Sequence, residues 1–526
     1  MSASAPTPPA PRELLLLALL VLVAAALRLH SLDVAPGYSG DEGYEAFYGW
    51  QTAEHRIFQQ NPVRPYLGPW FLWLMAPFIG VLGPGPLGAR LPVALLGTAG
   101  VMLAWAIGRR LAPERAATSG LLAAGLFAVA PFAVLFSRLS LSVATTPFWV
   151  LLGVLTTLRL AERPSAGRGL ALGLVVGAAV SFHPQGLLLG VVAAAVGVAI
   201  AGRAVLVPRV LGAAALGFAA VAWPVWVMIL DQVGLGPGID YSGTWVDGAE
   251  PSPLPVRVVR SVPQVLDGLV GGRMLHWVAG PSSADPPGEW LGLLCAAGLL
   301  GSLGWALTRP ERIARSLAGG LGLAWALTVL RSAAFDLGGL TRERYLLTTL
   351  TLLVPLLAWA AATLPWARWL AAGLAGVQGL ALFTGFFMPM ATTGGDAEPS
   401  FVAAQPDAKV QAAAWIRSRL GPDEEGLLLA GDAWSYWPLV SLLGERMPAD
   451  FVPEDPGGCA AVLARTSHRR RWLVDYPGWH WNRAILDCLE RAGAPTTPAF
   501  VPTSVGGAPA LLVWELPPTS PAKGTP

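Results

Sequence analysis

Long apolar runs separated by short polar loops fill this chain from residue 14 to residue 388. A helix of about 20 apolar residues is long enough to cross a lipid bilayer. The pattern predicts about 11 membrane spans, over residues 14–27, 87–107, 118–136, 141–157, 170–182, 186–201, 210–230, 290–307, 316–329, 345–364 and 370–388. The run over residues 69–82 is shorter and rich in Trp and Pro, so we interpret it as an interfacial or re-entrant helix.

The pattern changes in residues 391–526, where short apolar stretches alternate with Pro, Gly and charge. Two segments have the spacing of amphipathic helices and three are typical of strands; they are residues 407–420 and 481–492, and residues 426–430, 471–476 and 510–516. Alternating helices and strands predict a small α/β domain, with a disordered tail after Pro517. The expected fold class is a polytopic α-helical membrane protein, residues 1–390, with a small C-terminal α/β domain.

Composition favours a membrane protein. Hydrophobic residues make up 54% of the 526 residues and charged residues only 13%, and the mean hydropathy is +0.54. Soluble globular domains have about 25% charged residues, so the composition excludes that class. No basic groove interleaved with aromatic residues occurs, which excludes nucleic acid as a partner.

The distribution of the arginines predicts how the spans are oriented across the membrane. The arginines gather in the loops around Arg109, Arg163 and Arg312, whereas the loops between hold few basic residues. Because basic loops stay in the cytoplasm, we expect a multi-pass protein of the inner (cytoplasmic) membrane. The first outer loop (31–68), the long outer loop (231–289) and the C-terminal domain then lie on the periplasmic or extracytoplasmic side. Arg28 follows the first span without a small-x-small cleavage site, so that span is expected to remain uncleaved.

The first outer loop contains an acidic, aromatic stretch over residues 38–51, YSGDEGYEAFYGWQ. Ser39 and Glu42 have the spacing of a helix capping box, which would give Glu42 a structural role. Asp41 and Glu45 are four residues apart, so they lie on one helical face and repel unless a ligand or a proton intervenes. A solvated helix face is the competing interpretation.

Several short motifs resemble the membrane glycosyltransferases that use polyprenyl-phosphate sugars (GT-C-like). This superfamily includes protein O-mannosyltransferases, lipid A aminoarabinose transferases and bacterial glycosyltransferase family 39. The resemblance covers about the first four hundred residues in layout, and only short motifs are specific. The matching features are Arg28, Leu32-Asp33, Asp41-Glu42, Tyr44, residues 65–77, residues 90–98 (RLPVALLGT) and residues 342–347 (RERYLL). The pair His183-Pro184 departs from the sequence that relatives often show there.

The resemblance implies that Asp41 is the general base that deprotonates an acceptor hydroxyl, with Glu42 in support. Arg342 and Arg344, beside Tyr345, are placed at the outer end of a span, where a guanidinium fork would hold the departing phosphate. A pair of arginines that snorkel to the interface is the alternative.

Tyr44, Glu45, Arg138 and His183 complete the candidate substrate-binding residues. An arginine that caps a helix C-terminus is the commoner case for a residue such as Arg138, and a packed loop residue is the commoner case for His183. The aromatic stretch over residues 431–437 is suited either to stacking an acceptor sugar or to core packing.

The cysteines and the search for metal-ligand patterns identify no further site residue. Cys295 lies inside a predicted span, while Cys459 and Cys488 lie in the C-terminal domain, where a disulfide is allowed but not required by their spacing. No closely spaced Cys/His motif is present, so no metal site is assigned, and whether a divalent metal assists is left open.

Together these observations predict an inverting glycosyltransferase that moves a hexosyl or pentosyl group from a polyprenyl-phosphate donor to a lipid, glycan or protein acceptor. A transporter or flippase of lipid-linked glycans is the rival; it predicts charges near mid-membrane and repeat symmetry, and no clear internal repeat is seen. A membrane scaffold whose outer domain binds a partner is the third alternative.

Overall fold

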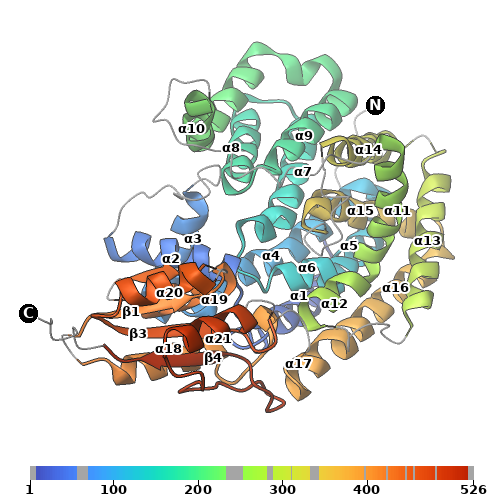
Figure 1. The fold of residues 1–526 in the computed structure, drawn as a ribbon. Helices are drawn as coiled ribbons and strands as arrows, with labels where there is room; N and C mark the ends of the chain where they lie inside the picture. The colour runs from blue at the N-terminus through green and yellow to red at the C-terminus, as the bar shows by residue number, and fades with distance from the viewer. Residues whose placement is uncertain are drawn as a thin grey trace, which may run out of the picture.

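The computed structural model describes most of the chain, in two parts that pack on each other: a large helical bundle and a smaller region built on a β-sheet (Figure 1). The described residues are 7–55, 69–232, 253–280, 288–309, 311–331, 343–395, 399–421, 424–444, 447–453, 456–479 and 482–518. In Figure 1 the sheet lies at one end of the bundle, next to α2.

The bundle is built from the apolar runs. Its long helices are α1 (Pro11–Leu29), α4 (Pro86–Leu111), α5 (Ala116–Val129), α7 (Thr146–Glu162), α8 (Ala166–Phe182), α9 (Gly186–Ala201), α10 (Pro208–Gln232), α13 (Glu289–Ala306), α14 (Arg312–Arg331), α15 (Glu343–Thr363) and α16 (Ala367–Leu382). Further elements connect them: α2 (Gly40–His55), α3 (Trp70–Leu82), α6 (Pro131–Phe136), η2 (Ser142–Thr145), α11 (Leu254–Val270), α12 (Gly272–Ala279) and α17 (Met388–Thr392).

Seven helical segments among the described residues are long and apolar enough to cross a membrane. They correspond to seven of the predicted spans; they are Pro86–Leu111, Ser142–Glu162, Gly186–Leu206, Glu289–Ala306, Arg312–Leu330, Arg344–Thr363 and Ala367–Thr392. The segment in α15 is 94% buried, so this helix forms the centre of the bundle. Two further predicted spans appear as shorter apolar helices, Ala166–Phe182 and Pro208–Trp223.

One predicted span is wrong, because it is not a continuous helix. Residues 118–136 do not form a single helix, because α5 ends at Val129 and α6 begins at Pro131. Ala130 between them is extended, with φ −62° and ψ 121°. Proline lacks an N–H and disfavours the helical conformation of the preceding residue, which explains the break. The segment over residues 69–82 is a helix of 13 residues, α3, which is too short to cross on its own.

The C-terminal region contains a four-stranded sheet in the order β2-β1-β3-β4. β1 is parallel to β2 and β3, and β3 is antiparallel to β4; the strands are β1 (Gly426–Ala430), β2 (Ala449–Phe451), β3 (Arg470–Asp475) and β4 (Leu512–Leu516). Its helices are α18 (Ala408–Arg419), α19 (Ala433–Leu443), α20 (Pro456–Arg465) and α21 (Asn482–Arg491). The three predicted strands and two predicted helices are present, whereas β2, α19 and α20 were not predicted.

Both faces of the sheet are covered, which explains why β1 is buried along its whole length. Leu427 and Leu429 belong to a small core with the side chains of α20 and α21, and Leu428 and Ala430 belong to the large core shared with the bundle. Alternate residues of a strand point to opposite faces, so this one strand joins the two cores.

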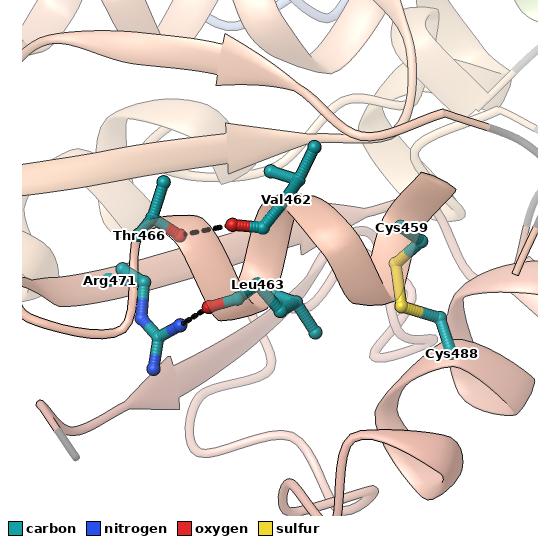
Figure 2. Close-up of a disulfide and its surroundings, with 6 residues drawn as sticks. All are labelled: Cys459, Val462, Leu463, Thr466, Arg471 and Cys488. Atoms are coloured by element: carbon teal, nitrogen blue, oxygen red, sulfur yellow. Dashed lines mark hydrogen bonds between the residues drawn. A yellow bond between two sulfur atoms is a disulfide. The ribbon is translucent and has the colours of Figure 1, made fainter. Parts of the chain in front are cut away.

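A disulfide between Cys459 of α20 and Cys488 of α21 closes the small core, with a Cα–Cα distance of 5.9 Å (Figure 2). Beside it, Arg471 of β3 donates to the carbonyl oxygen of Leu463 at 2.5 Å. The disulfide that the sequence allowed is therefore formed, and Cys295 is a buried free thiol.

Replacing Cys459 by Ser should destabilise this region by about 3 kcal/mol, because the disulfide closes a loop of 29 residues and limits the unfolded chain. Hydrogen exchange at the β3 amides measures the loss. Cys295→Ala is the matched control and should leave β3 protection unchanged. Equal protection in the Cys459 variant and the wild type would contradict a stabilising role.

Candidate active site

The acidic stretch forms α2, and one of its carboxylates is a buried structural group. Glu42 accepts two hydrogen bonds from Arg90 of α4, at 2.7 and 2.8 Å, and one from the backbone N–H of Ser140 at 2.8 Å. The backbone N–H and the hydroxyl of Ser39 also donate to it, at 3.1 and 3.0 Å. The side chains of Glu42 and Arg90 are both 0% exposed. Glu42 is therefore saturated with hydrogen bonds and has no access to a substrate.

Arg90 uses its remaining donors to hold the loop before α2. It donates to the carbonyl oxygens of Leu32, Pro36 and Gly37, at distances between 2.8 and 3.0 Å. A planar guanidinium suits such a buried, multiply bonded position. Arg90 lies in the motif over residues 90–98, but the sequence alone gave it no role.

Glu45 is also buried, at 2% exposure. It accepts hydrogen bonds from the backbone N–H of Ser142 at 2.8 Å and from the Ser142 hydroxyl at 3.1 Å. The expectation that Asp41 and Glu45 share an open face is therefore corrected, because Glu45 is turned onto η2. Together Glu42 and Glu45 fix α2 against the segment that contains Ser140 and Ser142.

Of the three carboxylates in the acidic stretch over residues 38–51, Asp41 is the one that remains accessible, with its side chain 24% exposed. The structure brings it to Arg344 at the start of α15, with 4.0 Å between Asp41 Oδ2 and Arg344 Nη1. The Arg344 guanidinium carbon lies 5.2 Å from the centre of the Tyr345 ring, and its Nη2 is 3.4 Å from the Tyr345 hydroxyl. Asp41, Arg344 and Tyr345 thus form one site, whereas Arg342 lies outside the described residues.

The turn between α8 and α9 contacts the start of α15, next to Arg344. Gln185 donates its side-chain N–H to the carbonyl oxygen of Arg344 at 2.8 Å, and its backbone N–H lies 3.3 Å from His183 Nδ1. Gln185 is 8% exposed. His183, which is half-buried, is thereby placed near the start of α15. Gln185 was missed from the sequence, because a glutamine in a loop carries no recognisable signal.

Arg138 has a different position. It is 0% exposed and donates to backbone carbonyls at the end of α1 and just after it; these belong to Leu27, Arg28, His30, Ser31 and Ala35. Such contacts neutralise the free carbonyls and the negative end of the helix dipole. The geometry is that of a helix cap, realised on α1, and it leaves the guanidinium inside the protein.

Tyr44 lies at the contact between α2 and α19. It is 2% exposed, and its ring makes edge-to-face contacts with Tyr48 at 5.0 Å and with Trp437 at 4.7 Å. Next to it Gly43 allows the two helices to touch, since a Cβ there would lie 2.3 Å from the Pro438 nitrogen. The C-terminal region therefore packs directly on the helix that carries Asp41, and the stretch over residues 431–437 contributes core packing.

A second buried ionic group reinforces this contact. Asp407 accepts hydrogen bonds from the backbone N–H groups of Tyr38 and Lys409, both at 2.9 Å, and the Lys409 ammonium donates to the carbonyl oxygen of Ser400 at 2.7 Å. Burial lowers the pKa of Lys409, and the Asp407 carboxylate opposes that shift. Burial also raises the pKa of Tyr38. These groups are structural because they lie away from solvent.

Among the described residues, no group of three or more His, Cys, Asp or Glu side chains is suited to hold a metal ion. The site itself combines a carboxylate, Asp41, with a cation, Arg344, at a distance of 4.0 Å.

Comparisons with known proteins bear on the fold of the chain. A family model described as dolichyl-phosphate-mannose-protein mannosyltransferase matches residues 63–228. The structure is similar to ArnT from Cupriavidus metallidurans bound to undecaprenyl phosphate, with a TM-score of 0.66 and 16% identity over 98% of this chain and 100% of that chain. It is also similar to an Archaeoglobus fulgidus oligosaccharyltransferase tethered with an acceptor peptide, with a TM-score of 0.51 and 14% identity over 88% of this chain and 69% of that chain. No curated protein sequence matches the chain. The fold is that of ArnT and of this oligosaccharyltransferase, and the resemblance stated from the sequence motifs is confirmed.

Proposed function

We propose that this chain, which has a membrane glycosyltransferase fold, transfers a sugar from a polyprenyl-phosphate donor to an acceptor hydroxyl with inversion at the anomeric carbon. The main observation behind the proposal is that the three carboxylates of the acidic stretch differ in exposure to solvent. Glu42 and Glu45 are buried in hydrogen bonds, while Asp41 stays accessible beside Arg344.

In the proposed reaction the acceptor oxygen attacks the anomeric carbon as the bond between that carbon and the phosphate oxygen breaks. Asp41 takes the proton of the acceptor hydroxyl, which makes the oxygen a better nucleophile. Arg344 offers a guanidinium fork to the phosphate, which gains negative charge as it leaves. The products are the glycosylated acceptor, the lipid phosphate and a protonated Asp41, which then returns its proton to solvent.

The buried contacts around Asp41 support catalysis by fixing geometry. Glu42 and Glu45 attach α2 to the bundle, and Gly43 sits against α19. A catalytic group performs best when its supporting residues hold it within a fraction of an ångström. Gln185, through the Arg344 carbonyl, positions the cation in the same way.

The nature of the donor rests on the comparisons. One similar structure contains undecaprenyl phosphate, and the matching family model is named after dolichyl-phosphate-mannose. A polyprenyl-phosphate hexose or pentose is therefore the proposed donor, and a lipid, glycan or protein is the proposed acceptor. The arginine pattern of the loops supports a site on the periplasmic or extracytoplasmic face of the inner membrane.

The proposal is tested by incubating the purified protein with a panel of polyprenyl-phosphate sugars and measuring released polyprenyl phosphate. Release with at least one donor is the expected result. The flippase alternative predicts that lipid-linked glycans cross the bilayer of proteoliposomes with the sugar–phosphate bond intact, and this outcome would overturn the proposal.

Replacing Arg344 by Ala should lower kcat by about a hundredfold, since it removes a cation that meets charge developing in the transition state. Lys should lower kcat less, because it keeps the charge and loses the planar fork. Specific activity per folded molecule is the measurement, and Arg273→Ala, at an exposed arginine of α12, is the matched control. Normal specific activity in Arg344→Ala would favour the interfacial interpretation of this arginine.

A further inference from the structure

A hollow of about 450 Å³ lies between α9 and α14, apart from the candidate active site. Its walls combine cations with very small side chains. Arg312, Arg315, Ser316 and Gly319 of α14 line it together with Ala195 and Ala199 of α9. We refer to it as the α9/α14 groove.

The groove exists because the two helices meet closely at one level and leave a gap beside it. At Gly320 a Cβ would lie 2.8 Å from Val196 Cγ2 and 3.0 Å from Val192 Cγ1. At Gly319, by contrast, no described atom lies within 4 Å of the Cβ position. Small residues on both helices therefore keep the space beside the contact open.

The groove lies at the end of the bundle opposite the candidate active site. α9 begins directly after Gln185, which bonds to Arg344. Ala199 is 13 residues beyond Gly186, the first residue of α9, which corresponds to about 20 Å along a helix. The arginine-rich loops place this end in the cytoplasmic leaflet, where anionic lipids are enriched.

Charge and polarity make the groove suitable for a phosphate diester. Arg312 and Arg315 are both exposed, and Arg312 Nε donates to the carbonyl oxygen of Ala199 at 3.0 Å, which orients its guanidinium across the groove. Both arginines lie in the first turn of α14, where the helix dipole also favours an anion. Ser316 donates its hydroxyl proton to the Arg312 carbonyl, so its oxygen is available to accept from a headgroup hydroxyl.

The surroundings indicate that the anion carries an apolar tail. Val191 and Val198 of α9 are 43% and 41% exposed, and both lie on the same helix as Ala195 and Ala199. In a membrane-spanning helix such exposed apolar side chains face lipid. A free phosphate would contact the arginines alone, whereas a phospholipid would also place its acyl chains against these exposed apolar side chains of α9.

We propose that the α9/α14 groove binds the headgroup of an anionic phospholipid in the leaflet opposite the candidate active site. Arg312 and Arg315 hold the phosphate, and the Ser316 oxygen accepts from a headgroup hydroxyl such as that of phosphatidylglycerol. The glycerol backbone and the start of an acyl chain lie over Ala195, Ala199 and Gly319. Basic pockets between helices on the cytoplasmic side are suited to such headgroups.

Titration of the delipidated full-length protein with phosphatidylglycerol or phosphatidylcholine, followed by native mass spectrometry, tests the site. The wild type should bind phosphatidylglycerol in preference. An Arg312→Gln/Arg315→Gln double variant should bind it about thirtyfold more weakly, since each arginine near a membrane surface contributes about fivefold. The control Arg203→Gln/Arg209→Gln removes the same charge from exposed arginines that do not line the groove, and it should weaken binding less than the groove variant does.

A second variant tests whether the open volume of the groove is needed, in addition to the charge of its arginines. Gly319→Leu keeps both arginines and fills the groove, and it should weaken phosphatidylglycerol binding while the protein stays folded. Undiminished binding in Gly319→Leu, equal losses in the two double variants, or complete displacement of the lipid by inorganic phosphate would each overturn the proposal.

Discussion

An Asp41→Asn variant should bind its lipid-linked donor normally and turn it over at least about a hundredfold more slowly than the wild type. Asn keeps the size of Asp and most of its hydrogen bonds but cannot accept a proton, and a general base contributes about 10²- to 10⁴-fold to a rate. Because the Asp41 side chain is partly exposed, the substitution should not disturb folding. Turnover and donor affinity, measured on the same purified sample, separate chemistry from binding.

Glu45→Gln is the matched control for this prediction. It makes the same chemical change one helical turn away, at a carboxylate that bonds to Ser142 instead of facing solvent. This variant should lose folded yield, and the molecules that fold should retain most of their specific activity. Near-normal turnover in Asp41→Asn, or an equal loss of specific activity in both variants, would remove Asp41 from the role of base.

The second large effect is expected at the buried ion pair. Replacing Arg90 by Met should lower the free energy of unfolding by about 3–5 kcal/mol, since it leaves Glu42 buried and without its main partner. Glu42→Gln should be similarly damaging, because Arg90 then keeps three carbonyl contacts but loses its counter-charge. Thermal unfolding in detergent measures both losses.

The partly exposed pair of Arg110 and Glu162, at 3.2 Å and with side chains 19% and 34% exposed, is the control. Glu162→Gln should cost less than about 1 kcal/mol, as surface ion pairs do. In the double variant Arg90→Met/Glu42→Gln the two losses should be less than additive, because the residues act as one unit. Additive losses would show that they act independently.

Local features of the site could be predicted from the sequence, and the long-range contacts could not. The capping-box spacing of Ser39 and Glu42 predicted the contact between them. It accounts for a small part of the surroundings of Glu42, because Arg90 and Ser140 are 48 and 98 residues away along the chain. Spacing holds no information about such partners. For the same reason Asp41 and Glu45 seemed equivalent on one helical face until the contact with Ser142 distinguished them.

For the fold, too, the local elements could be predicted from the sequence and the long-range contacts could not. Apolar periodicity predicted most helices of the bundle and three of the four strands, since each depends on local pattern. The break at Ala130 was missed because the apolar run continues through Pro131. β2 has three residues, and α20 starts with Pro-Gly-Gly, so neither has a recognisable signal. Contacts with the rest of the fold stabilise these elements.

The anomeric configuration of the product is the decisive measurement for the proposed role of Asp41. If Asp41 is the base of a single displacement, the glycosylated acceptor must have the configuration opposite to that of the polyprenyl-phosphate donor. Nuclear magnetic resonance of the product, with a donor of known anomeric configuration, gives the answer. The proposed single displacement predicts inversion. Retention would contradict the proposed mechanism, since a single in-line displacement by the acceptor oxygen must invert the anomeric carbon.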